Sequence, residues 1–443
     1  MKKQDQNNAS RRDFVINGSL MAGGLMTAPL LSKANFFSGA EDTIKVAVVG
    51  CGGRGTGAAM QALSSKQNVK IVALCDAFKD NVDNCHKELT EEINNSIGEL
   101  AKRLDVPEER KFTGFDGYKK AIALADVVIL ATPPGFRPIH FEEAINQGKH
   151  VFMEKPVATD PAGVQKVLAT AAIAKQKKLN VVVGLQRHYQ NSYRELFKRK
   201  DLIGDITSMQ AWWDNDGVWT RPRKAGQTEM EYQMRNWYYF NWLCGDHITE
   251  QHIHNLDVIN WFKGGYPVKA QGFGGRQVRT SKEHGEIFDH HFVEFEYADG
   301  SILNSQCRHM PGTMSRVDEL LIGTKGRIAC GAAHIKDHSG KIIYQYDTKK
   351  ENNPYQTEHD ELFAAIAKGE YKFADAENGA KSTMTSILGR MATYSGQMVY
   401  WDKAIHSGID IHPKVYAWDA TPPVVPNADG SYPIAIPGIT KYS

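Results

Sequence analysis

The sequence predicts an α/β protein: a doubly wound parallel sheet on the N-terminal side, then an α+β domain with a large, mostly antiparallel open sheet. Three observations predict this fold. A β-branched apolar run leads directly into a glycine-rich loop, apolar runs and helical segments then alternate, and a series of short strand-like runs follows. The length of 443 residues also exceeds what one hydrophobic core usually holds, so two domains are expected.

The composition is that of an ordinary soluble globular protein, with 42% hydrophobic and 23% charged residues. Its 53 basic and 51 acidic side chains leave a net charge of +2. This balance gives no electrostatic footprint for nucleic acid, so nucleic-acid binding is not expected. The six cysteines show neither paired metal spacing nor a disulfide framework. They indicate small buried residues of a chain that folds in a reducing compartment.

Residues 1–40 are predicted to be an export signal and linker. Arg11 and Arg12 stand in the stretch S-R-R-D-F-V, and a Gly- and Ala-containing apolar run over 16–31 follows. Paired arginines before a modest apolar segment are typical of a twin-arginine signal, and the run is too short and Gly-rich to span a bilayer comfortably. A tail without signal function is the alternative. We expect a periplasmic protein, membrane-anchored if the signal is not cleaved, with no membrane span in the mature chain.

The first apolar run, Ile44–Val49, is predicted to be a buried parallel strand that leads into the loop G-C-G-G-R-G. Gly50, Gly52 and Gly55 form the pattern G-x-G-x-x-G, in which the glycines permit a tight turn, approach of a pyrophosphate and close helix–strand packing. The helix expected over 56–64 would offer free N–H groups to the phosphates. The loop residues predicted to bind a dinucleotide are Gly50, Gly52, Gly53, Arg54 and Gly55.

A second predicted strand, 69–75, ends in Asp76. That carboxylate is placed to accept hydrogen bonds from the adenosine ribose hydroxyls. Because no Arg follows it immediately to hold a 2′-phosphate, NAD is favoured, and NADP stays an alternative.

Two more predicted strands, 126–132 and 150–153, flank a helix expected around 140–147. Residues at the carboxyl ends of successive parallel strands line the ligand crevice, so a Rossmann domain is predicted over 43–185. The residues expected to meet the cofactor in this crevice are Thr132, Pro133, Glu154 and Lys155.

The T-P pair at 132–133 and the stretch G-K-H-V-F-M-E-K-P at 148–156 resemble the glucose–fructose oxidoreductase, inositol dehydrogenase and rhizopine catabolism family, Gfo/Idh/MocA. The resemblance runs from about Ile44 to Lys403. It implies a Rossmann domain, an α/β domain with a large open sheet, and homo-oligomers, dimers or tetramers, joined through that sheet. One departure is a loop between Pro133 and His140 that is longer than the family's usual one.

Lys155 is a candidate catalytic residue on physical grounds. An ammonium beside the nicotinamide can polarise a carbonyl oxygen and stabilise a developing alkoxide. A surface ion pair with Glu154 is the alternative, but the position at a strand end in the crevice favours a functional role.

A second cluster lies in the stretch G-D-H-I-T-E-Q-H-I-H-N-L-D at 245–257. A continuous helix running to Trp261 would place Glu250, His254 and Asp257 on one face. The stretch resembles the family's D-x-x-x-H-x-x-D helix. This resemblance implies that His254 is the general base and that Glu250, standing where the family more often has Asp, orients a hydroxyl or the histidine.

Other interpretations of this cluster stay open. The histidines could form an exposed polar face or be satisfied core residues. His247, Glu250 and His254 could also bind zinc, but their spacing matches none of the usual helical zinc motifs, so no metal is expected.

Aromatic residues interleaved with Arg and Asn at 219–242 suit the stacking of carbohydrate, although a core or an oligomer contact would also use them. The stretch Q-R-H at 186–188 follows the strand predicted over 181–185, at the hinge between the domains. The residues predicted to bind substrate are Arg187, His188, Arg235, Trp237 and Asp257.

The C-terminal half is predicted as three parts. Strand-like runs and the turn A-D-G at 298–300 place a substrate and oligomerisation domain at 186–350. Helices at 351–403 return toward the Rossmann domain, and 404–443 forms a tail over the surface.

Taken with the resemblance, these features predict an NAD(P)-dependent oxidoreductase acting on a sugar, polyol or glycoside, with His254 as base and Lys155 in support. A redox-neutral, NAD-dependent glycoside-cleaving enzyme and a sugar–sugar oxidoreductase with retained cofactor are alternatives. A non-catalytic binding protein is a further alternative, which the intact glycine loop, Lys155 and His254 oppose.

Overall fold

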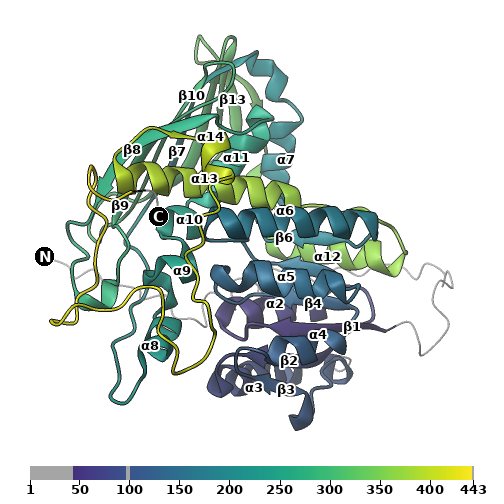
Figure 1. The fold of residues 1–443 in the computed structure, drawn as a ribbon. Helices are drawn as coiled ribbons and strands as arrows, with labels where there is room; N and C mark the ends of the chain where they lie inside the picture. Colours follow the sequence, from purple (N-terminus) through teal and green to yellow (C-terminus); the bar gives the residue numbers. More distant parts are fainter. Residues whose placement is uncertain (1–42, 96–99, 442–443) are drawn as a thin grey trace, which may run out of the picture.

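The computed structural model describes residues 43–95 and 100–441. The predicted signal with Arg11 and Arg12 lies outside the described residues. Figure 1 shows a parallel sheet flanked by helices and, beside it, a larger sheet that helices cover on one face. The predicted fold class is therefore confirmed.

The N-terminal sheet has six parallel strands in the order β3-β2-β1-β4-β5-β6, which is the usual order of a dinucleotide-binding Rossmann fold. The strands are β1 (Ile44–Val49), β2 (Val69–Asp76), β3 (Lys111–Thr113), β4 (Val127–Leu130), β5 (His150–Met153) and β6 (Val181–Val183). The α-helices are α2 (Gly53–Leu63), α3 (Lys79–Asn95), α4 (Gly117–Ala123), α5 (Arg137–Asn146) and α6 (Pro161–Gln176). Short 3-10 turns are η2 (Leu100–Arg103), η3 (Glu108–Arg110) and η4 (Pro134–Phe136).

The second sheet has nine strands in the order β14-β13-β12-β11-β7-β10-β9-β8-β15, and only the β10–β7 pair is parallel. The strands are β7 (Ile206–Asn215), β8 (Lys269–Gly275), β9 (His290–Glu296), β10 (Ile302–His309), β11 (Arg316–Gly323), β12 (Gly326–Ala329), β13 (His334–Asp337), β14 (Ile342–Gln345) and β15 (Val399–Tyr400).

The helices of this half fall before, between and after the strands. They are α7 (Asn191–Phe197), α8 (Glu229–Arg235), α9 (Asn241–Cys244), α10 (His247–Glu250), α11 (Ile253–Lys263), α12 (Pro354–Ala367), α13 (Ala376–Ser395) and α14 (Trp401–Ile405). The 3-10 turns are η5 (Gln186–Tyr189), η6 (Lys200–Ile203), η7 (Trp237–Tyr239), η8 (Lys282–His284) and η9 (Thr348–Lys350).

The burial of the strands explains why the two sheets read differently in the sequence. Strands β4 and β5 are buried almost throughout because helices cover both faces of the parallel sheet. Strands β9 and β10 alternate between buried and half-buried residues, because only one face packs on helices. On that face Gly389 lets α13 approach the sheet, since a Cβ there would lie 2.9 Å from both Ile248 and Phe295.

Two predicted regions need correction, and one observed hairpin was not predicted. The helix expected to run unbroken to Trp261 is two helices, α10 and α11, separated at Gln251–His252. The region 351–403, expected to be helical, also contains the short strand β15 between α13, which ends at Ser395, and α14. The β13–β14 hairpin was not predicted; it adds two short strands, of which β14 forms the edge of the sheet and exposes Ile342 and Ile343.

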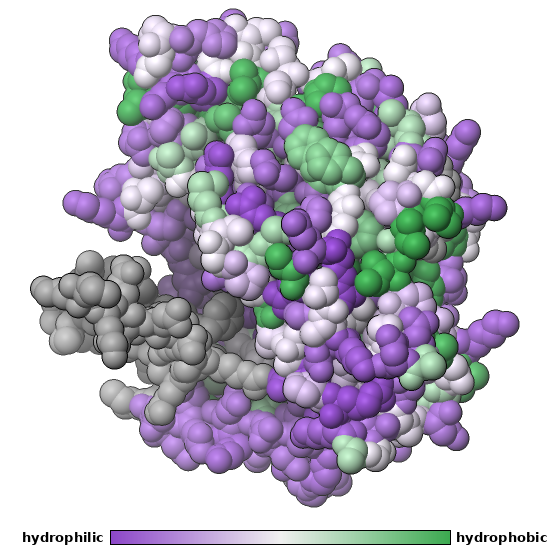
Figure 2. Space-filling model, turned by 90° about the vertical axis from the view of Figure 1, so that its left-hand side faces the viewer, coloured by the Kyte–Doolittle hydropathy of each residue, from purple (hydrophilic) through white to green (hydrophobic). Residues whose placement is uncertain are grey.

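The last segment, from His406 to Lys441, forms neither helix nor strand; it first runs down past α9 and α8 and then turns back up (Figure 1), so that the Gly438 N–H bonds to the Ser395 oxygen at the end of α13. On the part of the described surface that Figure 2 shows, hydrophobic residues form several separate patches among hydrophilic ones. Over residues 43–95 and 100–441, no helix has both the length and the apolar character to cross a membrane.

Candidate active site

The glycine loop between β1 and α2 has the space that a diphosphate requires. Gly50 has φ +101°, and a Cβ there would lie 2.4 Å from the Ala131 carbonyl carbon. A Cβ on Gly55 would lie 1.8 Å from the Gly50 oxygen, so the third glycine is needed for helix packing. By contrast, Gly52 and Gly53 have no atom within 4 Å of a built Cβ. The open side of the loop therefore faces the N-terminus of α2, where anions bind.

Asp76 ends β2 beside this loop. One carboxylate oxygen accepts a hydrogen bond from the Cys51 backbone N–H at 2.8 Å, and the other accepts from Phe78 N–H and the Asn81 side chain at 3.0 Å each. Burial raises the pKa of the Asp76 carboxyl, although these hydrogen bonds act in the opposite direction. The carboxylate is thereby fixed next to the loop, where it can meet a ribose.

The chain just after Asp76 is covered by residues from far away in the sequence. The Arg235 guanidinium lies 3.6 Å from the centre of the Phe78 ring and makes two 2.8 Å hydrogen bonds to the Asp80 carboxylate. Trp418, from the C-terminal tail, packs on Phe78 at 5.0 Å between ring centres. Arg235, predicted to bind substrate, thus lies on the adenosine side of the nucleotide site.

Arg54 in the glycine loop points to protein partners. Its guanidinium pairs with Glu154 after β5 and with the buried Glu358 of α12, at 3.4 Å, and lies 5.3 Å from the Tyr355 ring centre. Burial lowers the pKa of Arg54, but the two carboxylates more than offset this, and the net pKa is raised. Arg54 therefore stays charged and ties the glycine loop to the end of β5 and to α12.

Arg137 is a site residue that the sequence interpretation missed. Its buried side chain donates to the Glu154 carbonyl oxygen at 2.9 Å and to the Thr132 carbonyl oxygen at 2.6 Å. It thus joins the ends of β4 and β5, which form the crevice. The longer loop after Pro133 was the only signal for it: the loop adds the turn η4, and α5 begins at Arg137.

Lys155 and Glu250 meet across the two domains. The Lys155 ammonium donates to the Glu250 backbone oxygen at 2.5 Å and to its carboxylate at 3.1 Å, and both side chains are about nine-tenths buried. The second Glu250 carboxylate oxygen is buried without a hydrogen-bond partner. The end of β5 is therefore joined to the end of α10, with one free acceptor beside the ammonium.

His254 lies in the first turn of α11, close to this pair. Burial lowers the pKa of its imidazole well below the ordinary value, and the positive charges of Lys155, Arg187 and Arg54 lower it further. The ring packs on Trp213 at 5.8 Å, and its Nδ1 is buried with no hydrogen-bond partner. The imidazole is therefore neutral at neutral pH, and one nitrogen has no partner within the described chain.

The break between α10 and α11 is part of the site's geometry. The His252 backbone N–H bonds to the His247 oxygen, five residues back, rather than to the residue four back. The His252 side chain bonds to Ser305 of β10 at 2.6 Å. Such wide single turns are frequent at functional sites. Glu250 and His254 still both lie near Lys155, although no continuous helix joins them.

The other predicted substrate residues pair with protein groups. Arg187 forms a buried ion pair with Glu319 of β11, which also binds Tyr193 and Asn255. His188 binds Asp257 at 2.7 Å and stacks on Trp261.

Asp257 accepts two further hydrogen bonds, from Asn378 at 3.0 Å and from Ser382 at 2.7 Å. It thereby joins α11 to α13.

The aromatic stretch divides into two parts. Tyr239, Phe240 and Trp242 are almost fully buried and form a core with the tail. Trp219 is 39% exposed and packs edge-on against Trp237 at 6.0 Å. Only this second part offers aromatic surface to a ligand.

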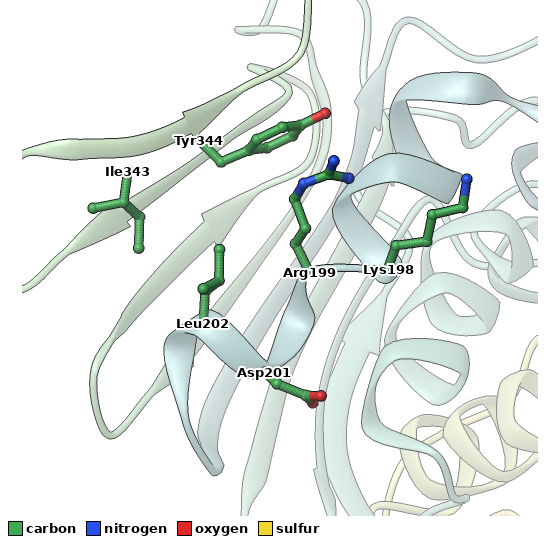
Figure 3. Close-up of a pocket in the computed structure, with 6 residues that line it drawn as sticks. All are labelled: Lys198, Arg199, Asp201, Leu202, Ile343 and Tyr344. Carbon is green, nitrogen blue, oxygen red and sulfur yellow. The ribbon is translucent and has the colours of Figure 1, made fainter.

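Two further features lie away from these residues. Among the described residues, His247, Glu250 and His254 do not gather their ligand atoms into one group; His247 lies instead with Asp246 and His291. A surface hollow of about 430 Å³ lies at the edge of the second sheet, where the Arg199 side chain points toward the Tyr344 ring (Figure 3). Its lining, which contains none of the predicted site residues, consists of Lys198, Arg199, Asp201, Leu202, Ile343 and Tyr344.

Comparison with known proteins identifies the first domain. The Gfo/Idh/MocA model, an oxidoreductase family with an NAD-binding Rossmann fold, matches residues 44–185. Inositol 2-dehydrogenase of Gluconacetobacter diazotrophicus is 28% identical over 244 residues, which cover 54% of this chain and 60% of that protein. The chain thus spans less than two thirds of this curated relative.

Two solved structures share the whole fold. Aldose-aldose oxidoreductase from Caulobacter crescentus, complexed with glycerol, has a TM-score of 0.63 at 18% identity and covers 81% of this chain and 99% of its own. Scyllo-inositol dehydrogenase from Lactobacillus casei, with bound NAD(H) and scyllo-inositol, has a TM-score of 0.60 at 21% identity, with coverage of 81% and 99%.

Proposed function

We propose that this chain is an NAD-dependent oxidoreductase acting on a hydroxyl-bearing carbon of a sugar or polyol; the match of residues 44–185 to the Gfo/Idh/MocA oxidoreductase model and the similarity to inositol 2-dehydrogenase support this. NAD, when bound, supplies the hydride acceptor. The residues fit this cofactor: the space at Gly52 and Gly53 and the N-terminus of α2 suit a diphosphate, and Asp76 suits the ribose. Thr132, Pro133 and Glu154 line the crevice at the ends of β4 and β5.

The proton chemistry belongs to His254. As the substrate carbon becomes a carbonyl, its hydroxyl loses a proton. The neutral imidazole of His254 can accept that proton. The same cations that keep the imidazole neutral also oppose its protonation, so His254 is a weak base. Lys155 supplies the positive charge that stabilises the developing alkoxide. Glu250 positions Lys155 through two contacts.

The observation that carries the proposal is the meeting of Lys155, Glu250 and the neutral His254 at the carboxyl end of β5, on the edge of the sheet where the glycine loop lies. The test is incubation of the pure protein with a panel of sugars, polyols and glycosides and with NAD or NADP. Mass spectrometry and NMR then identify the products. Oxidation of a polyol or sugar hydroxyl with NAD preferred over NADP is expected. Turnover of none of the panel, or a clear preference for NADP, would contradict the proposal.

A second candidate is the same chemistry on a cofactor that never leaves, as in a sugar–sugar oxidoreductase or a redox-neutral glycoside-cleaving enzyme. What favours it is the cover over the adenosine side, made by Arg235 and by Trp418 of the tail. Nucleotide that survives gel filtration and activity without added NAD would support it. Protein that emerges empty and needs continuous NAD leaves an ordinary dehydrogenase.

We further propose export through the twin-arginine route, which carries folded proteins with their cofactors to the periplasm. The sequence S-R-R-D-F-V supports it. Normal export of a variant with both Arg11→Lys and Arg12→Lys would argue against it.

Assembly into homo-oligomers through the face of the second sheet that helices leave open is also proposed. On that sheet Phe273 is 65% exposed and stacks with Phe292 at 5.2 Å. Light scattering of the wild type and of Phe273→Asp tests this, because the charged variant should shift the mass toward the monomer.

A further inference from the structure

A second group of ionisable side chains lies one helical turn before Glu250, and the proposed reaction does not use it. Asp246, His247 and His291 bring one potential ligand atom each within 4.8 Å of one another, and all three residues are buried. We refer to these three residues as the Asp246 cluster. They come from the start of α10 and from β9, so the chain fold, not local spacing, brings them together.

The contacts within the cluster are close but incomplete. His247 Nδ1 lies 2.8 Å from one Asp246 carboxylate oxygen, and His291 Nε2 lies 3.3 Å from the other. Neither ring nitrogen of His247 has a well-oriented hydrogen bond, and His291 Nε2 has none either. His309 of β10 stacks on His247 at 4.4 Å between ring centres, and its Nε2 also lacks a partner. Four imidazole nitrogens around one carboxylate are therefore buried without satisfied hydrogen bonds.

Such an arrangement is costly without a further group. A buried polar atom with no partner loses its hydration without gaining a hydrogen bond in return. A divalent ion removes this cost because imidazole nitrogens and a carboxylate oxygen are its natural ligands.

Neighbouring side chains of α13 hold His291 and Asp246 of the cluster in position. The other nitrogen of His291 bonds to the Thr393 hydroxyl at 2.9 Å, and the Tyr394 hydroxyl donates to Asp246 at 2.5 Å.

The backbone is also shaped for this contact. Asp246 has φ +70°, in the left-handed region that favours glycine, so its backbone is strained. This conformation places Asp246 just before the first turn of α10, with its carboxylate against the ring of the next residue, His247. The Glu250 N–H bonds to the Asp246 backbone oxygen at 2.9 Å, so the cluster also fixes the turn that carries Glu250.

We propose that Asp246, His247 and His291 bind a structural divalent transition-metal ion, zinc being the best match. The full burial of the cluster indicates a closed site, which suits a structural ion better than one that meets substrate. The proposed ion holds α10, and with it Glu250, against β9.

Metal analysis of the purified full-length protein tests this directly. About one zinc ion per chain is expected in the wild type, retained through gel filtration, and its loss is expected in His291→Ala and His247→Ala. His359→Ala is the matched control. His359 is equally buried with both ring nitrogens unpaired, but it lies in α12 without a neighbouring ligand group, so this variant should keep the metal.

A second measurement holds even if the histidine variants fail to fold. Removal of metal from the wild type by a chelator should lower its thermal midpoint, and added Zn²⁺, but not Mg²⁺, should restore it. Cobalt-substituted protein should absorb visible light through its His ligands. Wild-type protein that carries no stoichiometric transition metal, and whose thermal midpoint does not respond to Zn²⁺, would overturn the proposal and leave a buried charge network.

Discussion

His247 and His254 lie in neighbouring helices of the same short segment, and their surroundings are opposite. His254 faces the positive charges of Lys155, Arg187 and Arg54, which add to the lowering of its pKa by burial. His247 lies against the carboxylate of Asp246 and beside two more histidines. Both rings are buried. One environment keeps an imidazole neutral, and the other brings two imidazoles close to one carboxylate.

The difference shows that residue type and spacing do not decide what a histidine does here. The deciding groups come from distant parts of the chain: Lys155 from the end of β5 for His254, and His291 from β9 for His247. The break at Gln251–His252 sits between the two histidines. Changes around His254 should therefore affect catalysis directly. Changes in the Asp246 cluster should first affect metal content and stability, and catalysis only through the position of Glu250.

The largest effect is expected for Lys155. The variant Lys155→Ala should lower kcat by about a hundredfold or more, because the alkoxide loses its buried counter-charge. NAD affinity, measured by calorimetry, should change little. Lys149→Ala, in the same sequence motif but outside the crevice, is the control and should keep normal turnover. A Lys155→Ala enzyme with normal kcat would remove this residue from the mechanism.

A smaller loss is expected for Glu250. The variant Glu250→Gln keeps the shape but loses the charge that positions Lys155, so kcat should fall on the order of tenfold, the value of one charge-assisted hydrogen bond. KM should change less than kcat, and Glu250→Asp should recover part of the rate. Loss of bound metal in Glu250→Gln would contradict the expectation that metal binding by the Asp246 cluster does not depend on the Glu250 charge.

The Rossmann half could be predicted closely because its signals are local. The run into the glycine loop, Asp76 at the end of β2 and the E-K-P stretch after β5 all lie where the sequence indicated. The buried parallel strands are short apolar runs, and the loop's glycines are required by sterics at Gly50 and Gly55.

The remainder depends on partners that no local pattern reveals. Nothing near Arg187 in the sequence indicates its ion pair with Glu319, 132 residues away. The helix break occurs at Gln251–His252 without Gly or Pro, where the His252 side chain bonds to β10. The β13 and β14 strands have four residues each and bury only Ile335, so the alternation that marked the central strands is absent there.

The smallest effect on stability is expected for a third histidine, which lies in the C-terminal tail and pairs with two carboxylates. His412 of the tail lies 3.0 Å from Asp160 and 3.1 Å from Asp410. Burial lowers its pKa, but the two carboxylates more than offset this, so the pKa is raised above its ordinary value of 6.5. The protonated pair therefore contributes its full stability below that value, and the contribution is lost as pH rises through the raised pKa.

The measurement is the thermal midpoint of the wild type against His412→Asn. The variant should melt about two degrees lower at about pH 6, and the difference should shrink at about pH 9. A difference that grows with pH would mean that the tail is not held by the protonated form.

The central claim is that His254 takes the substrate proton during hydride transfer, and rapid mixing tests it most directly. Protein loaded with NAD is mixed with the sugar or polyol that the panel identifies, and the appearance of reduced nicotinamide is followed in the wild type and in His254→Asn. The His254→Asn variant should bind NAD normally but form reduced nicotinamide about a hundredfold or more slowly. The wild-type rate should persist to pH values well below 6.5, because the folded site lowers the pKa of His254. Reduction at an undiminished rate in His254→Asn would contradict the claim.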